Sequence, residues 1–120
     1  MKENDTTEVV ELLKSYAVYE SQLNAQKYAQ TYFDPYEKFQ EWGVEECRQK
    51  MNFIKKLIAE IAPSNEATLL NLHYINGISI EKCGECMFMS RSTAFRLLRK
   101  ALISVNKRYQ ELKGTTNERN

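Results

Sequence analysis

The chain has 120 residues, of which 42% are hydrophobic and 28% charged, a composition typical of a globular protein with one domain, or one domain and an extension. This length leaves no room for a separate catalytic domain, no apolar run approaches transmembrane length, and the polar start MKENDTTE does not resemble a signal peptide. The net charge of +1 conceals an asymmetry, since residues 91–120 hold 8 Lys and Arg against 2 Asp and Glu, whereas residues 1–60 hold 8 against 11. We therefore expect a cytoplasmic protein with three free thiols, no membrane contact and one basic segment.

The first half of the chain predicts two long helices. Apolar residues recur at steps of three and four from Thr6 to Thr31, and again from Val44 to Ala62. The second pattern has a coiled-coil type of spacing and comprises Val44, Cys47, Met51, Ile54, Ile58 and Ile61. Its partner is either the first helix, in an antiparallel hairpin, or a second copy of the chain in a homodimer. The hairpin is favoured because the first helix supplies a matching stripe.

Aromatic residues gather between these two helices, at Tyr32, Phe33, Tyr36, Phe39 and Trp42. Pro35 is expected to start a short helix there, with Asp34 as its cap. The rings are expected to fill the junction between the long helices, and contact with a ligand or a protein is the alternative.

A shorter helix is predicted from Glu66 to Ile75, after Pro63 has ended the second long helix. Its inward residues are expected to be Leu69, Leu70, Leu72 and Tyr74. The pair Asn76-Gly77 closes it, because Gly readily adopts the left-handed conformation that ends helices.

The stretch from Ser79 to Lys100 predicts two helices joined by a tight corner. Ser79 is expected to cap a helix over residues 80–87, and Ser90 a helix that starts at Arg91. The small residue Gly84 lets the two helices approach closely. The expected core positions are Ile80, Cys83, Met87, Met89, Ala94, Leu97 and Leu98. This pattern is typical of a helix-turn-helix, whose second helix enters the major groove of DNA, and a purely structural hairpin with a basic outer face is the alternative.

The second helix of this motif is predicted to continue well beyond it. Apolar residues alternate by four and three as far as Leu112. Gly114 is expected to stop the helix after Lys113, which leaves a flexible tail over residues 114–120.

Residues 69–102, LLNLHYINGISIEKCGECMFMSRSTAFRLLRKAL, resemble region 4 of bacterial sigma factors. They are more similar still to small sigma-like regulators of the autolysin-regulator type, encoded by phages of Gram-positive bacteria. The shared features are the leucine-rich helix, the stretch YINGISIE, the small Gly84, the start MSRST and the continuation RLLRKAL. The sequence departs from the pattern at Cys83, Cys86 and Phe88, where Ile, a charged residue, and Gly or Asn are usual. The resemblance implies control of transcription and contact with promoter DNA, RNA polymerase and activators. Residues 1–62 show none of the other sigma regions.

No metal, cofactor or enzymatic activity is predicted. Cys83 and Cys86 form a C-x-x-C that could complete four zinc ligands with Cys47 and His73. The chain has no second closely spaced pair, and Cys83 already falls on a core position of the motif. His73 is expected to pack or to form a hydrogen bond, and neither a Ser-His-Asp set nor a Gly-rich phosphate loop can be assembled.

The sequence therefore predicts an all-α fold with three segments. Residues 1–62 form a helical hairpin for dimerisation or partner contact, residues 63–113 form a helix-turn-helix domain with a long last helix, and residues 114–120 form the tail. The expected function is a DNA-binding transcription regulator, encoded by a phage or mobile element, with double-stranded DNA as its partner and RNA polymerase as a further candidate. The candidate DNA-binding residues are Ser90, Arg91, Ser92, Thr93, Phe95, Arg96, Arg99 and Lys100. The alternative is a protein-binding module or phage inhibitor that docks on RNA polymerase or another host nucleic-acid machine without reading DNA.

Overall fold

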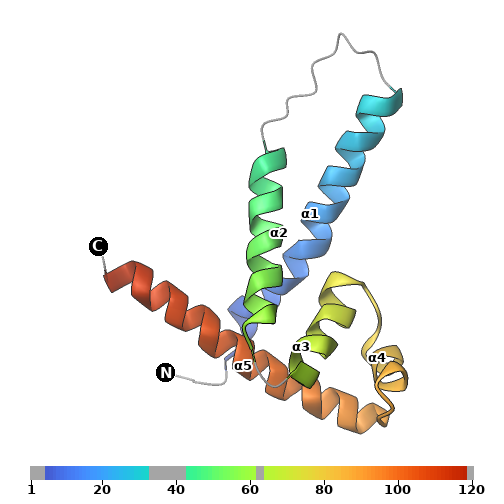
Figure 1. The fold of residues 1–120 in the computed structure, drawn as a ribbon, viewed down its shortest axis with the longest axis vertical. Coiled ribbons are helices and arrows are strands. Elements are labelled where there is room, and N and C mark those ends of the chain that lie inside the picture. Colours follow the sequence, from blue (N-terminus) through green and yellow to red (C-terminus); the bar gives the residue numbers. More distant parts are fainter. Residues whose placement is uncertain (1–4, 33–42, 62–63, 119–120) are drawn as a thin grey trace.

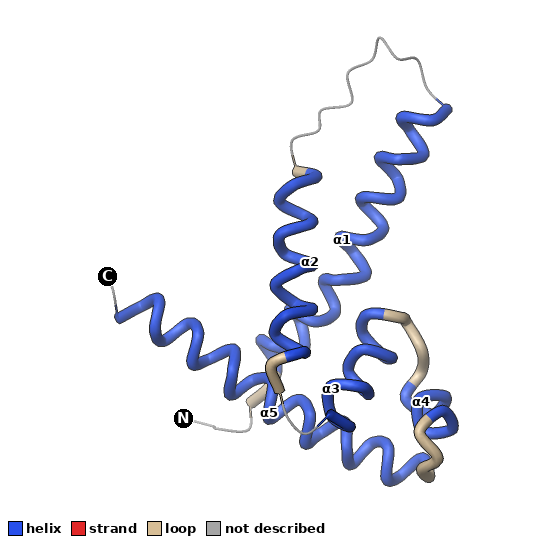
Figure 2. Tube along the Cα trace, viewed as in Figure 1, coloured by secondary structure: helices blue, strands red, loops and turns tan. Residues whose placement is uncertain are grey.

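The secondary structure is helical throughout the residues that the computed structural model describes, which are 5–32, 43–61 and 64–118. The helices are α1 (Thr7–Tyr32), α2 (Val44–Ala59), α3 (Ser64–Leu70), the short π-helix η1 (Asn71–Ile75), α4 (Ile80–Cys86) and α5 (Arg91–Glu118) (Figures 1 and 2). The predicted all-α class is confirmed. Within these ranges, no helix combines the length and the apolar character that crossing a bilayer requires.

Helices α1 and α2 form the predicted antiparallel hairpin, which rises away from α5 (Figure 1). The stripe of α1 buries Val9, Leu13 and Tyr16 against Ile54 and Ile58 of α2. The prediction that α2 packs against α1 of the same chain is thus confirmed. The predicted end of α2 at Ala62 is wrong, because the backbone N–H of Ile61 donates to the carbonyl of Ile58 at 3.2 Å, so that the last turn tightens and the α-helix ends at Ala59.

Three predictions fall on residues outside the described ranges. They are the aromatic filling of the junction by residues 33–42, the short helix at Pro35 with Asp34 as its cap, and the role of Pro63 as a helix end.

The base of the hairpin rests on α5, so that one hydrophobic core joins the two halves of the chain. Fully buried residues of this cluster come from α1, α2, α3 and α5; those outside the hairpin are Leu70, Ala101 and Val105. Small side chains at Ala101 and Val105 let α5 approach the hairpin closely. The division of the chain at residues 62 and 63 remains a prediction, but the two segments share this core.

The predicted helix over Glu66–Ile75 begins earlier, at Ser64, and finishes as the π-helix η1. The wider turn arises because the backbone N–H of Asn76 donates to the carbonyl of Asn71 at 3.0 Å, five residues back. Gly77 then reverses the chain with a φ of 72°, as the sequence predicted. The Nδ1 of His73 lies 2.7 Å from the carbonyl oxygen of Ile78, which accepts a hydrogen bond from the ring, and this bond stabilises the turn at Gly77.

The predicted end of the last helix at Gly114 is wrong. Helix α5 continues through this glycine to Glu118. A glycine inside a helix costs about 1 kcal/mol relative to alanine, but it ends the helix only where the backbone turns left-handed. Only two glycines of the described residues, Gly43 and Gly77, take a positive φ.

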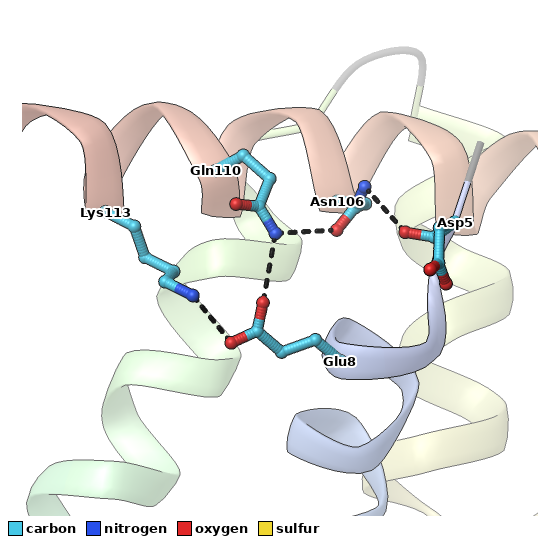
Figure 3. A network of polar contacts seen from close by, with 5 residues as sticks. All are labelled: Asp5, Glu8, Asn106, Gln110 and Lys113. Carbon is cyan, nitrogen blue, oxygen red and sulfur yellow. Dashed lines mark hydrogen bonds and ion pairs between the residues drawn. The ribbon is translucent and has the colours of Figure 1, made fainter. Parts of the chain in front are cut away.

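A polar network fastens the start of α1 to the second half of α5 (Figure 3). Glu8 accepts from the Nζ of Lys113 at 2.6 Å and from the Nε2 of Gln110 at 3.2 Å, and Asn106 donates to the carbonyl of Asp5 at 3.3 Å. These five residues form the α1–α5 clasp. A separate ion pair joins the hairpin to α5, with the Nε of Arg108 2.7 Å from the Oε1 of Glu60.

Acid is expected to destabilise the protein through these two ion pairs. The hydrogen bond from Lys113 lowers the pKa of Glu8, and the one from Arg108 lowers the pKa of Glu60, both from an ordinary value of 4.5. A lowered folded-state pKa contributes stability above pH 4.5 that is lost as the pH falls through the folded value. Melting temperatures measured from pH 7 to pH 3 should therefore fall less steeply for a Glu8→Gln, Glu60→Gln double variant than for the wild type.

The matched control is Glu11→Gln, which changes an exposed carboxylate of α1 that forms no ion pair among the described residues. Its melting curve should keep the acid dependence of the wild type. Equal slopes for the double variant and the wild type below pH 4.5 would contradict the prediction.

Candidate nucleic-acid interface

Two serine caps define the corner between α4 and α5, as the sequence predicted. The Oγ of Ser79 accepts from the backbone N–H of Lys82 at 3.2 Å, and the Oγ of Ser90 accepts from that of Thr93 at 3.2 Å. Each cap satisfies a backbone donor that the helix leaves without a partner. The start of α5 is therefore fixed at Arg91.

The close contact between α4 and α5 depends on Gly84. A Cβ atom placed there would lie 3.1 Å from the carbonyl oxygen of Met89 and 3.2 Å from the Cβ of Ala94, so only hydrogen fits without a shift. The cluster beneath the corner has a buried centre and a partly buried rim, and it contains all seven predicted core positions together with Leu69, Leu72 and Ile78. The predicted packing of the motif is confirmed.

The corner itself turns at Phe88, which adopts a left-handed backbone with a φ of 58°. The backbone N–H of Met89 then returns to the carbonyl of Gly84 at 2.9 Å. Phe88 thus takes the conformation for which Gly or Asn is usual at this place in the motif. Its ring is 97% exposed and packs against neither helix.

The long helix α5 presents one continuous exposed face. With 100° between successive residues, seven exposed side chains from Ser92 to Lys107 lie within about 60° of the direction of Arg96. They span about 22 Å along the axis and are Ser92, Thr93, Arg96, Arg99, Lys100, Ile103 and Lys107. This outer face lies opposite the buried Ala94, Ala101 and Val105.

The cations of the outer face are free to bind an external anion. Arg96, Arg99, Lys100 and Lys107 have no ion-pair partner among residues 5–32, 43–61 and 64–118. Four like charges without counter-charges over a few helical turns repel one another and create a positive potential. A polyanion bound along this face would relieve that repulsion.

The structure separates Arg91 and Phe95 from the other candidate residues. The Nε of Arg91 lies 3.2 Å from the Oε1 of Glu81, and its guanidinium carbon lies 5.5 Å from the centre of the Phe95 ring. These contacts hold Arg91 against α4 rather than on the outer face. Ser90 and Thr93 flank it, with their hydroxyl oxygens 2.9 Å apart.

Lys107 was not predicted as a candidate residue, and the basic segment has fewer cations available for an external ligand than its charge suggests. Lys107 follows Arg96, Lys100 and Ile103 at the helical spacings of four, three and four, a signal that was available from the sequence. Arg108 and Lys113 belong to the same basic segment, yet they pair with Glu60 and Glu8 of the hairpin. Charge counting does not distinguish these two groups, because their partners lie far away in the sequence.

Cys47, Cys83, Cys86 and His73 do not gather into one group that could hold a metal ion, although the ring of His73 and the thiol of Cys83 contact the same carbonyl oxygen, that of Ile78, at 2.7 and 3.6 Å. Cys47 is buried and its thiol donates to the Oε1 of Gln22 at 3.3 Å, whereas Cys83 belongs to the core beneath the corner and Cys86 is exposed. Burial raises the pKa of the Cys83 thiol. No group of three or more His, Cys, Asp or Glu that could hold a metal ion occurs in the part of the chain that the structure describes.

Comparison with known proteins gives one family match. A family model described as protein of unknown function, DUF1492, matches residues 28–106, from the later part of α1 to the middle of α5. No curated protein and no solved structure matches the chain. Since the match covers more than half of the sequence, the chain belongs to the DUF1492 family of proteins of unknown function.

Proposed function

We propose that the protein is a DNA-binding transcription regulator, encoded by a phage or mobile element, that acts in the cytoplasm through the helix-turn-helix of α4 and α5. The observation that carries this proposal is the outer face of α5, whose four cations have no ion-pair partner in the part of the chain that the structure describes. The capped corner and the similarity of residues 69–102 to region 4 of sigma factors support it.

In this proposal, the first turns of α5 enter the major groove and Arg96 reads a base. Arg96 lies at the centre of the outer face, with Ser92 one turn before it, so that both side chains are directed to the floor of the groove. Arginine can donate two hydrogen bonds to guanine O6 and N7. Arg99 and Lys100 lie about 60° and 40° to opposite sides of Arg96 around the helix, which suits phosphates on the two walls of the groove.

In this proposal, the hairpin does not contact DNA. Its acidic residues Glu8 and Glu60 neutralise the second half of the basic segment, which directs DNA to the first half. Contact with RNA polymerase or a second copy of the chain would use the hairpin surfaces that face away from α5.

The experiment that tests the proposal is selection of binding sites from a library of random duplexes, followed by fluorescence anisotropy on the selected site and on a random duplex. Enrichment of a common sequence, bound at least tenfold more tightly than the random duplex, is expected. Binding to purified RNA polymerase without affinity for any duplex at low salt would support the protein-docking alternative instead.

Binding should depend on salt with a slope set by the unpaired cations. Each neutralised phosphate contributes about −0.9 to the slope of log affinity against log salt, so four contacts predict a slope of about −4. Lys107→Ala is expected to reduce the slope by about 1. Lys113→Ala should leave it unchanged, because Lys113 is engaged by Glu8 in the α1–α5 clasp. A slope near −7 for the wild type would show that the paired cations also bind phosphate.

A further inference from the structure

Phe88 combines two features that do not stabilise the fold. It is the only residue other than glycine with a positive φ among the described residues, a conformation in which the Cβ atom crowds the backbone. Its ring is also 97% exposed, the largest fraction among the exposed large hydrophobic side chains of the described residues. Asparagine or glycine would relieve both features. A residue held in a strained conformation without a packing role is a candidate for binding a partner.

The position of Phe88 places it beside the end of α5 that is proposed to enter DNA. The corner lies at the extremity of the molecule where α4 meets α5 (Figure 1). Only one residue separates Phe88 from the cap Ser90, so their Cα atoms are at most about 7 Å apart. A duplex bound at the start of α5 would therefore lie close to Phe88.

The surroundings of the ring favour an apolar contact. Glu81 pairs with Arg91, and Lys82 pairs with Glu85, so the charges at the corner are balanced within the protein. Along α5, the first cation without an ion-pair partner among the described residues is Arg96, more than a turn beyond the cap. The corner and the N-terminal end of α5 thus present the ring of Phe88 and hydroxyl groups, rather than a cation available to bind a phosphate.

We infer that Phe88 contacts the 5-methyl group of a thymine in the major groove and thereby helps to specify the bound sequence. In the major groove, this methyl group is the apolar feature that distinguishes thymine from the other bases, and phenylalanine is among the side chains that contact it. The inference rests on the proposed function. It adds a specificity residue in the corner, outside the recognition helix.

The test removes the methyl group from the DNA and the ring from the protein. Each thymine of the selected site is replaced singly by deoxyuridine, which keeps base pairing and lacks only the methyl group. At one position the wild type should lose roughly three- to fivefold in affinity, as expected for one buried methyl group. Phe88→Asn should bind the parent site more weakly by a similar factor and lose nothing further on that uracil, which forms a double-mutant cycle.

Two controls make the result specific. Phe88→Asn and Phe88→Gly should both melt no lower than the wild type, because Asn and Gly tolerate the left-handed backbone. Thr93→Ser removes a neighbouring methyl group of the protein and should remain sensitive to the same uracil.

Several outcomes would overturn the inference. They are a wild type that tolerates every uracil, a selected site without thymine, and a folded Phe88→Asn variant that binds as tightly as the wild type or keeps its sensitivity to the uracil. If the wild type selects no sequence and binds no duplex, the proposed function itself fails, and the inference fails with it.

Discussion

Ile58→Ala is expected to lower the free energy of unfolding by about 2–5 kcal/mol. Ile58 is fully buried in the core that α1, α2, α3 and α5 share, where the loss of three carbon atoms leaves a cavity that the surrounding helices cannot fill. Urea denaturation followed by far-ultraviolet circular dichroism measures the change. The matched control is Ile103→Ala, which makes the same substitution on the outer face of α5 and should cost under about 1 kcal/mol.

The same variant tests whether the hairpin and the helix-turn-helix unfold together. Because Ala101 and Val105 of α5 belong to the core that contains Ile58, we expect one cooperative transition. Hydrogen exchange of the α4 and α5 amides should then accelerate in Ile58→Ala by a factor that corresponds to the loss of global stability. Unchanged exchange in α4 and α5, with faster exchange in α1 and α2, would show that the two halves are independent units.

Arg96→Ala is expected to weaken binding to the selected DNA site by about 1–3 kcal/mol, and binding to a random duplex by much less. The reason is its place at the centre of the outer face, without a partner among the described residues. Arg99→Ala and Lys100→Ala should weaken binding to both duplexes alike, since phosphate contacts carry no sequence information. Fluorescence anisotropy at fixed salt measures all four affinities, and a thermal melt confirms that each variant folds.

The control for Arg96 is Arg108→Ala on the same helix. Arg108 is engaged by Glu60 and Glu111, so its loss should leave both DNA affinities nearly unchanged. If a folded Arg96→Ala variant bound the selected site as tightly as the wild type, the basic face would be better explained as a docking surface for an acidic protein.

The parts of the fold that the sequence predicted are those that local interactions determine. The caps at Ser79 and Ser90 depend on hydrogen bonds across three residues, and the need for a small residue at Gly84 follows from the short connection after it. The stripes of α1 and α2 reflect the helical period. Each of these signals lies within one or two turns of the chain, so a single sequence contains it.

The parts that escaped prediction depend on residues far apart in the chain or on a choice between similar local energies. Lys107 and Arg108 are neighbours in sequence, but only Arg108 meets a carboxylate, and its partner Glu60 comes from another helix. The ion pair between Arg108 and Glu60 therefore could not be predicted from the charges in the sequence. The π-helical turn of η1 and the passage of α5 through Gly114 differ from the predicted helices by about the energy of one hydrogen bond or one glycine, which local preferences do not resolve.

The α1–α5 clasp has a consequence for the order of folding during synthesis. Glu8 and Lys113 are 105 positions apart, and Asp5 and Asn106 are 101 apart. The buried stripe of α1 therefore lacks its α5 neighbours until Ala101 and Val105 have left the ribosome, and closure of so long a loop is slow. Until then, Val9 and Leu13 can pack only against α2. A nascent chain halted before residue 101 would expose this apolar surface, which makes it a substrate for chaperones and proteases.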